Sequence, residues 1–172
     1  MPRNVEIKAR VPDLSAVRTR AVSLVSIPAE LVSQVDTFFA VPRGRLKLRE
    51  FADGAGELIV YERADRNGPK ESDYVRVGCA DPQALREALA RALPVRGQVR
   101  KRREVFFAGR TRIHLDQVEG LGSFVELEVV LRAGESVEDG EREARDLMQK
   151  LAIPDGALVA AAYIDLLAKT PA

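Results

Sequence analysis

Cysteine, histidine and long apolar runs are scarce in this chain. Cys79 and His114 are single copies among 172 residues, which excludes a disulfide framework, a cysteine-based zinc site and a metal site built from several histidines. No apolar run approaches the roughly 18–20 residues that a membrane-spanning helix needs, and residues 1–4 lack the start of a signal peptide. We therefore expect a soluble, cytoplasmic protein without membrane contact.

Charged residues are abundant and unevenly distributed. The sequence holds 27 Lys and Arg against 26 Asp and Glu. Residues 1–115 carry 22 basic and 14 acidic residues, whereas residues 116–172 carry 5 and 12. Arginine supplies 21 of the 27 basic residues, and its planar guanidinium suits bidentate contact with oxyanions. The length and the 46% apolar content fit one folded domain over residues 1–172.

The hydrophobic pattern predicts an α+β protein that is mainly β. Eight strands are expected at residues 3–11, 31–41, 44–51, 57–64, 72–79, 99–108, 110–116 and 123–132, separated by turns rich in Gly, Pro, Asn and Asp. Four helices are expected at residues 14–24, 82–93, 137–151 and 157–168. The first three follow Asp13, Asp81 and Ser136, which are good helix caps.

Five of the expected strands pair a charged face with an apolar face. In the third, Arg45, Lys47 and Arg49 alternate with Leu46 and Leu48, so the three cations share one face. The ordinary interpretation of such a strand is a half-solvated antiparallel sheet. However, neighbouring like charges cost stability unless an anion lies among them. The row therefore favours a face that binds an anion.

An acidic face complements this cationic one. Glu126 and Glu128 share a face in the last expected strand, and Glu6 is their counterpart in the first. Three carboxylates suit a hard divalent cation, and a surface carrying both faces would bind a metal–polyphosphate complex. If these faces point inwards, eight strands can close into a polar barrel that holds one small ligand.

Seven segments occur in an order that matches one known family. They are Asn-Val-Glu-Ile-Lys at residues 4–8, Gly-Arg-Leu-Lys-Leu-Arg-Glu at 44–50, and residues 34–39, 101–103, 112–116, 119–128 and 162–167. In these segments the chain resembles the CYTH superfamily, also called triphosphate tunnel metalloenzymes, whose signature is Glu-x-Glu-x-Lys. The resemblance implies an eight-stranded antiparallel β-barrel tunnel with inward charged side chains and helices packed outside.

The resemblance also implies roles for individual residues. Glu6, Glu126 and Glu128 would bind Mg²⁺ or Mn²⁺. The triphosphate would contact Lys8, Arg45, Lys47, Arg49, Lys101 and Arg103. Arg63 would join this set, although a one-residue slip in its strand would place Glu62 inside instead. Lys8, Arg112 and Asp116 are the expected catalytic residues.

Several residues have two interpretations at this stage. Asn4 stands where the family has the first Glu of its signature. It either offers the metal site a neutral amide oxygen in place of a carboxylate, or lies at a frayed strand end and contacts only solvent. His114 has a structural or a chemical role. Tyr163 and Asp165 either cover the tunnel or pack the last helix. The segment that contains Asp36 is expected to serve packing and a strand-end contact.

The leading hypothesis is a class IV adenylyl cyclase-like enzyme that converts ATP to cyclic AMP and pyrophosphate. The alternatives are a phosphohydrolase acting on tripolyphosphate, thiamine triphosphate or a nucleotide, and a module that binds triphosphate without turnover. A nucleic-acid-binding barrel ranks last, because the basic run at residues 96–103 alternates and aromatic residues are few. The expected partner is a small-molecule triphosphate, and a homodimer is left open.

Overall fold

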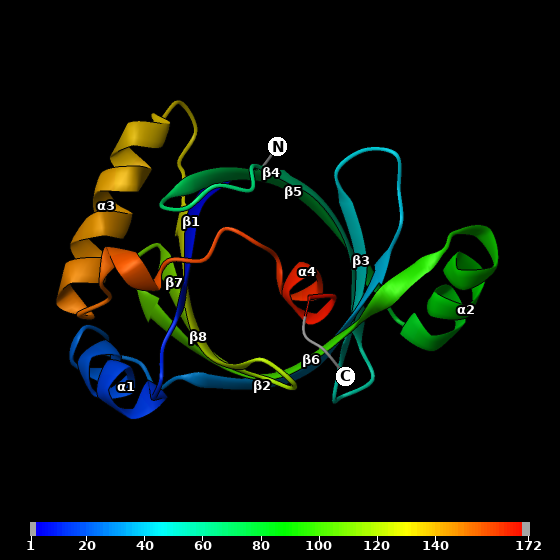
Figure 1. The fold of residues 1–172 in the computed structure, drawn as a ribbon, viewed down its shortest axis with the longest axis horizontal. Coiled ribbons are helices and arrows are strands. Elements are labelled where there is room, and N and C mark those ends of the chain that lie inside the picture. The colour runs from blue at the N-terminus through cyan, green and yellow to red at the C-terminus, as the bar shows by residue number, and fades with distance from the viewer. Residues whose placement is uncertain (1–2, 170–172) are drawn as a thin grey trace.

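Eight antiparallel strands close into a barrel in the computed structural model, which describes residues 3–169 (Figure 1). The strands are β1 (Arg3–Arg10), β2 (Glu30–Phe39), β3 (Arg45–Phe51), β4 (Gly56–Arg63), β5 (Lys70–Cys79), β6 (Val95–Ala108), β7 (Thr111–Val118) and β8 (Gly122–Val130). Their order around the barrel is β1-β5-β4-β3-β2-β6-β7-β8, and β8 pairs again with β1. The predicted barrel of eight antiparallel strands is confirmed.

The first three helices and the 3₁₀ turn pack against the outside of the barrel wall, whereas the last helix lies over one end of the barrel (Figure 1). They are α1 (Leu14–Ser23), α2 (Pro82–Ala92), α3 (Val137–Lys150), the 3₁₀ turn η1 (Asp155–Ala157) and α4 (Tyr163–Leu167). Helices α1 and α3 lie against β8, α1 also against β7 and α3 against β1, whereas α2 lies against β2 and β3. Within the described residues, no helix is both long and apolar enough to span a membrane.

The predicted caps begin three of these helices. Asp13 accepts a hydrogen bond from the Ser15 amide, and Asp81 and Ser136 do the same for residues three positions further along the chain. Such caps satisfy amide groups that have no partner inside the helix. The starts of α1, α2 and α3 are therefore set by local sequence.

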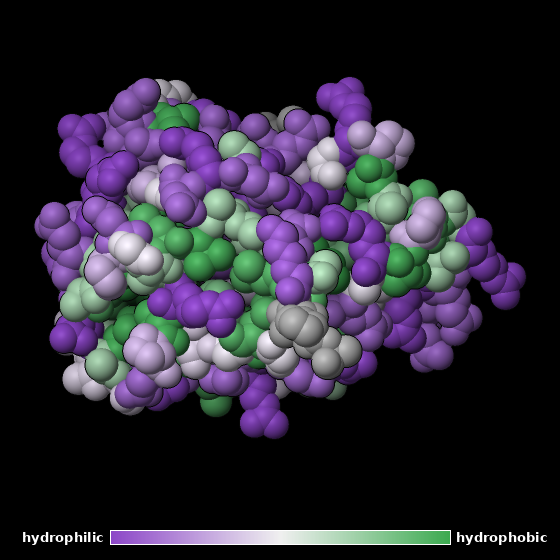
Figure 2. All heavy atoms as spheres, viewed as in Figure 1, coloured by the Kyte–Doolittle hydropathy of each residue, from purple (hydrophilic) through white to green (hydrophobic). Residues whose placement is uncertain are grey.

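One large apolar cluster lies outside the barrel, between the strands and the helices. Val5 and Ile7 on β1 are 0% and 1% exposed, and they belong to the same buried cluster as Leu147 and Met148 on α3. A Cβ at Gly140 of α3 would lie 2.7 Å from Val5, so glycine permits this close approach. Figure 2 shows hydrophobic side chains gathered between the helices on its left and the ring. The barrel interior is thus free to carry charged side chains, which line it together with apolar ones such as Phe38 and Val99.

The last expected helix, over residues 157–168, is wrong in extent. The chain there forms η1, then an irregular segment at 158–162, and then the short helix α4. The Val159 amide donates to the Lys8 carbonyl at 2.8 Å, and Leu158 forms a bridge with Ala9. These contacts with β1 override the helical preference of an Ala- and Leu-rich segment. Strand β6 also starts earlier than expected, at Val95.

Candidate active site

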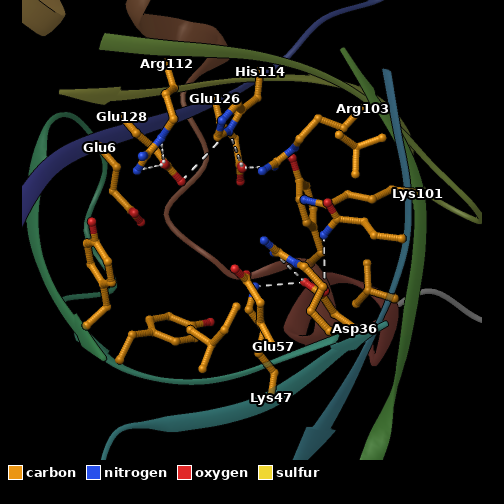
Figure 3. Close-up of a pocket in the computed structure, with 18 of the residues that line it drawn as sticks. Glu6, Asp36, Lys47, Glu57, Lys101, Arg103, Arg112, His114, Glu126 and Glu128 are labelled. Atoms are coloured by element: carbon orange, nitrogen blue, oxygen red, sulfur yellow. Dashed lines mark hydrogen bonds and ion pairs between the residues drawn. The ribbon is translucent and has the colours of Figure 1, made fainter. Parts of the chain in front are cut away.

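Alternate residues of the strands point into a cavity of about 370 Å³ inside the barrel (Figure 3). Its charged or polar lining includes Asn4, Glu6, Lys8, Asp36, Lys47, Arg49, Glu57, Arg63, Arg76, Lys101, Arg103, Arg112, His114, Glu126 and Glu128. The two-residue period expected for the charged faces is therefore observed on the inner wall. Arg63 faces inwards and the Glu62 side chain is 63% exposed, which resolves the register of β4.

One aspartate holds two of the cations on β3. Asp36, which is 2% exposed, lies 2.8 Å from Lys47 Nζ and 2.8 Å from Arg49 Nε. Burial acts to raise the pKa of Asp36, but Arg49 and Lys47 hold it well below its usual value. Burial also lowers the pKa of Lys47 to about 8, against the opposing effect of Asp36. Asp36 is thus an ion-pairing residue of the cavity rather than a packing residue.

A second aspartate holds the cations of β6. Asp116 is fully buried and accepts from Lys101 Nζ at 2.9 Å, from Arg103 Nε at 2.6 Å and from the Tyr163 hydroxyl at 3.0 Å. Burial opposes its ionisation, yet Arg103 and Lys101 lower the pKa of Asp116. The carboxylate is enclosed by its partners and does not line the cavity. This geometry favours a positioning role over direct contact with a substrate.

Three side chains on β7 and β8 form a cluster of candidate metal ligands. Ligand atoms of His114, Glu126 and Glu128 lie within 4.8 Å of one another. Two carboxylates and one imidazole fit a divalent cation. Arg103 is ion-paired with Glu126, and Arg112 NH2 lies 2.7 Å from Glu128 Oε2. Burial acts against ionisation of Glu128, but His114 and Arg112 lower its pKa to about 2. Both glutamates predicted as metal ligands on β8 therefore lie in this cluster.

Glu6, the third carboxylate expected in the metal site, is paired elsewhere. It lies opposite Glu128 in the β1–β8 register, yet its carboxylate accepts a hydrogen bond from Arg63. Burial raises the pKa of Glu6, and Arg63 opposes that effect. Asn4 is 3% exposed and lines the cavity, so the interpretation of position 4 as a frayed, solvated end is wrong.

The C-terminal segment and α4 cover one end of the barrel (Figure 1). Lys8 Nζ donates to the Ala161 carbonyl at 3.2 Å and lies 3.7 Å from the centroid of the Tyr163 ring. Tyr163 both lines the cavity and belongs to a buried apolar cluster. It therefore both covers the tunnel and packs the last helix. Arg45 does not line the main cavity, because it pairs with Asp65 and Asp165 at this end.

Sequence reasoning did not single out several lining residues. Glu57, Tyr61, Tyr74 and Arg76 of β4 and β5 face the cavity. The signal was present, because Glu57 and Tyr61 alternate with apolar residues in phase with Arg63. Extending the two-residue rule to β4 and β5 would have found them.

The sequence comparisons define the family. The CYTH domain model matches residues 2–163, which is nearly the whole chain. The chain therefore belongs to the CYTH family. No match was found among curated proteins.

Solved structures of similar fold cover almost the whole chain. The PH1012 protein from Pyrococcus horikoshii OT3 is 23% identical with a TM-score of 0.86, over 95% of this chain and 99% of that one. A candidate adenylate cyclase from Vibrio parahaemolyticus is 22% identical with a TM-score of 0.79, over 96% and 97%. HpAC1 from Hippeastrum, a candidate adenylyl cyclase described with a dominant triphosphatase activity, is 17% identical with a TM-score of 0.70, over 96% and 95%.

Proposed function

We propose that this chain is a divalent-metal-dependent enzyme that acts on an organic triphosphate bound inside the barrel. The observation that carries the proposal is the arrangement of two aspartate-anchored cation pairs in one cavity with a metal-competent acidic cluster. Lys47 with Arg49 and Lys101 with Arg103 supply charge-assisted donors for phosphate oxygens. Family membership supports the same conclusion.

The leading reaction is cyclisation of ATP, in which the ribose 3′-hydroxyl attacks the α-phosphorus and pyrophosphate leaves. The cavity also contains aromatic side chains, including Phe51, Tyr74 and Phe107, which suit the organic part of a nucleotide better than inorganic tripolyphosphate. Hydrolysis of the terminal phosphate by water is the second candidate, because the similar HpAC1 carries a dominant triphosphatase activity.

The proposed residue roles follow from position. The cation pairs would hold the triphosphate and offset the negative charge that develops on the leaving group. Lys8 and Arg112 lie next to the acidic cluster and would contact the phosphate at which reaction occurs. Glu126 and Glu128 are available to hold Mg²⁺ or Mn²⁺, which would supply Lewis-acid stabilisation of phosphate charge when bound.

A substrate panel tests the activity. Purified protein is incubated with Mg²⁺ or Mn²⁺ and with ATP, tripolyphosphate or thiamine triphosphate, and cyclic AMP and phosphate are measured. Cyclic AMP from ATP supports the leading reaction, and phosphate release alone supports the hydrolase. Binding of a triphosphate without any product would leave the non-catalytic module. An absence of both binding and turnover would refute the proposal.

Two arginines of β3 provide a matched pair of variants. Arg49→Ala removes a cavity cation and should weaken triphosphate binding about ten- to hundredfold, which corresponds to about 1.5–3 kcal/mol. Arg45→Ala should cost less, because Arg45 pairs with Asp65 and Asp165 outside the main cavity. Titration calorimetry with tripolyphosphate measures both. Equal affinity in the parent and Arg49→Ala would contradict the assignment of the cationic row.

A further inference from the structure

We propose that His114 is a protein ligand of the divalent cation, together with Glu126 and Glu128. The resulting site mixes one nitrogen with carboxylate oxygens and favours transition ions such as Mn²⁺ over Mg²⁺. This inference rests on the proposed function, since it concerns the metal of the same cavity. Its starting point is the register of the sheet, in which His114 on β7 lies directly opposite Glu126 on β8.

The environment of the imidazole points to a missing partner. His114 is 4% exposed, and its Nδ1 atom has no hydrogen-bond partner among the described residues. Buried polar atoms are nearly always paired, so an orphaned one needs an explanation. Nδ1 lies 3.8 Å from Glu126 Oε2 and 3.9 Å from Glu128 Oε1, which is too long for hydrogen bonds. Nitrogen and oxygen ligands of zinc lie about 2.0–2.2 Å from the ion, and two ligand atoms at such distances from one cation can be separated by up to about 4.0–4.4 Å.

The two carboxylates of β8 differ in how free they are for this role. Glu126 Oε2 faces His114 but accepts a hydrogen bond from Arg103, so a bound cation would replace that arginine at this oxygen. Glu128 directs Oε2 to Arg112 and leaves Oε1 towards His114. Glu6 is committed to Arg63, and Asn4 lines the cavity without a charge. The donor set nearest the metal position therefore has two carboxylates and an imidazole rather than three carboxylates.

Ligand type sets the expected metal preference. Carboxylate and water ligands suit both Mg²⁺ and Mn²⁺, whereas imidazole nitrogen is a ligand for first-row transition ions, a group that includes Mn²⁺ but not Mg²⁺. One buried nitrogen donor thus adds affinity for Mn²⁺ that it does not add for Mg²⁺. A buried residue on a short, rigid strand also holds its ligand atom in place, which favours a selective site.

The direct test is a nitrogen signal in the Mn²⁺ complex. His114 is the sole histidine of the chain, so imidazole coupling in pulsed electron paramagnetic resonance of a tag-free sample can come from no other residue. The parent protein with bound Mn²⁺ should show that coupling, and His114→Asn should lose it. Bound Mn²⁺ without imidazole coupling in the parent would overturn the inference, whether or not the variant folds.

Affinities provide the second readout. Titration of His114→Asn should show Mn²⁺ binding weakened on the order of tenfold or more, with a smaller change for Mg²⁺. Gln117→Ala, at an exposed position on the outer face of the same strand, is the control and should bind both ions like the parent. Equal losses for the two ions would contradict the nitrogen preference. Triphosphate turnover without imidazole coupling would refute this inference alone, whereas coupling without triphosphate binding or turnover would refute the proposed function alone.

Discussion

Replacing Asp36 with asparagine should destabilise the empty barrel and make its stability depend on added triphosphate. Asp36 is 2% exposed and lies 2.8 Å from both Lys47 Nζ and Arg49 Nε. A neutral amide in place of this carboxylate would leave two partly buried cations, each with a side chain 14% exposed, without this counter-charge. Removing one partner of a fully buried ion pair costs about 3–5 kcal/mol, so we expect a loss in the free energy of unfolding at or below the lower end of that range.

Triphosphate should offset much of this loss. Its oxygens can take the place of the missing carboxylate between Lys47 and Arg49, whose surroundings carry one more net positive charge in the variant. A ligand at about 100 times its dissociation constant stabilises the native state by about 2.7 kcal/mol. We therefore expect tripolyphosphate to raise the melting temperature of Asp36→Asn by more than it raises that of the parent.

Thermal and urea unfolding, each with and without tripolyphosphate, measure both effects. Asp73→Asn changes a carboxylate on the outer face of β5, between the cavity-lining Ser72 and Tyr74, and serves as the control, with unfolding close to that of the parent. Equal stability of Asp36→Asn and the parent without ligand would show that Asp36 does not balance the cations. A smaller gain from tripolyphosphate in the variant than in the parent would show that the anion does not occupy this position.

Three further results are expected. Glu126→Gln and Glu128→Gln should each abolish metal-dependent turnover, because each removes an anionic ligand with little change of shape; an unchanged Mn²⁺ titration in both would contradict this. Asn4→Glu should tighten Mn²⁺ binding and be less stable than the parent in chelator, as carboxylates repel without metal; identical chelator sensitivity would show that position 4 is irrelevant. Triphosphate affinity should fall as the pH rises through about 8, where Lys47 loses its charge. Lys47→Arg should shrink that step in a calorimetric pH series, and an unchanged step would assign it to another group such as Lys70, whose pKa burial also lowers to about 8.

The barrel wall was predictable because its periodicity is strong. Strand side chains alternate between two faces, so the charged residues at positions 45, 47 and 49 had to share a side. The apolar partners Leu46 and Leu48 are buried against α2, which fixes that side as the interior. Local hydrogen bonds at Asp13, Asp81 and Ser136 made the helix starts equally predictable.

The closed end of the barrel was not predictable from local pattern. Residues 157–168 favour a helix by composition, yet the Val159 amide bonds to β1 and the Ala161 carbonyl accepts from Lys8. Lys8 and Ala161 are 153 positions apart in the sequence. Such contacts depend on the closed barrel being formed first, and propensity does not encode them.

The composition of the candidate metal cluster could not be predicted from the sequence either. The alternation of strand β1 correctly predicted that the Glu6 side chain points into the barrel. It did not predict that the Glu6 carboxylate pairs with Arg63. Glu6 has both Glu128 and Arg63 within reach, and the buried arginine binds it because like charges repel in a dry interior. His114 enters the cluster through the register between β7 and β8, which no single-strand pattern reveals.

Arg103 connects the proposed phosphate-binding side of the cavity to the proposed metal side. Its guanidinium pairs with Asp116 and also with Glu126. A cation bound to Glu126 would compete for that carboxylate, and the freed arginine donor would be available to phosphate oxygens. Metal and triphosphate should therefore bind with positive coupling, each raising the affinity of the other by the same factor, within the range of about 5–150-fold.

Calorimetric titration of tripolyphosphate with saturating Mn²⁺ and with chelator measures this factor, after correction for Mn²⁺ bound to free tripolyphosphate. The coupling should shrink in Arg103→Lys, which keeps the charge but lacks the fork that bridges two carboxylates; full coupling in that variant would show that Arg103 does not link the two sites.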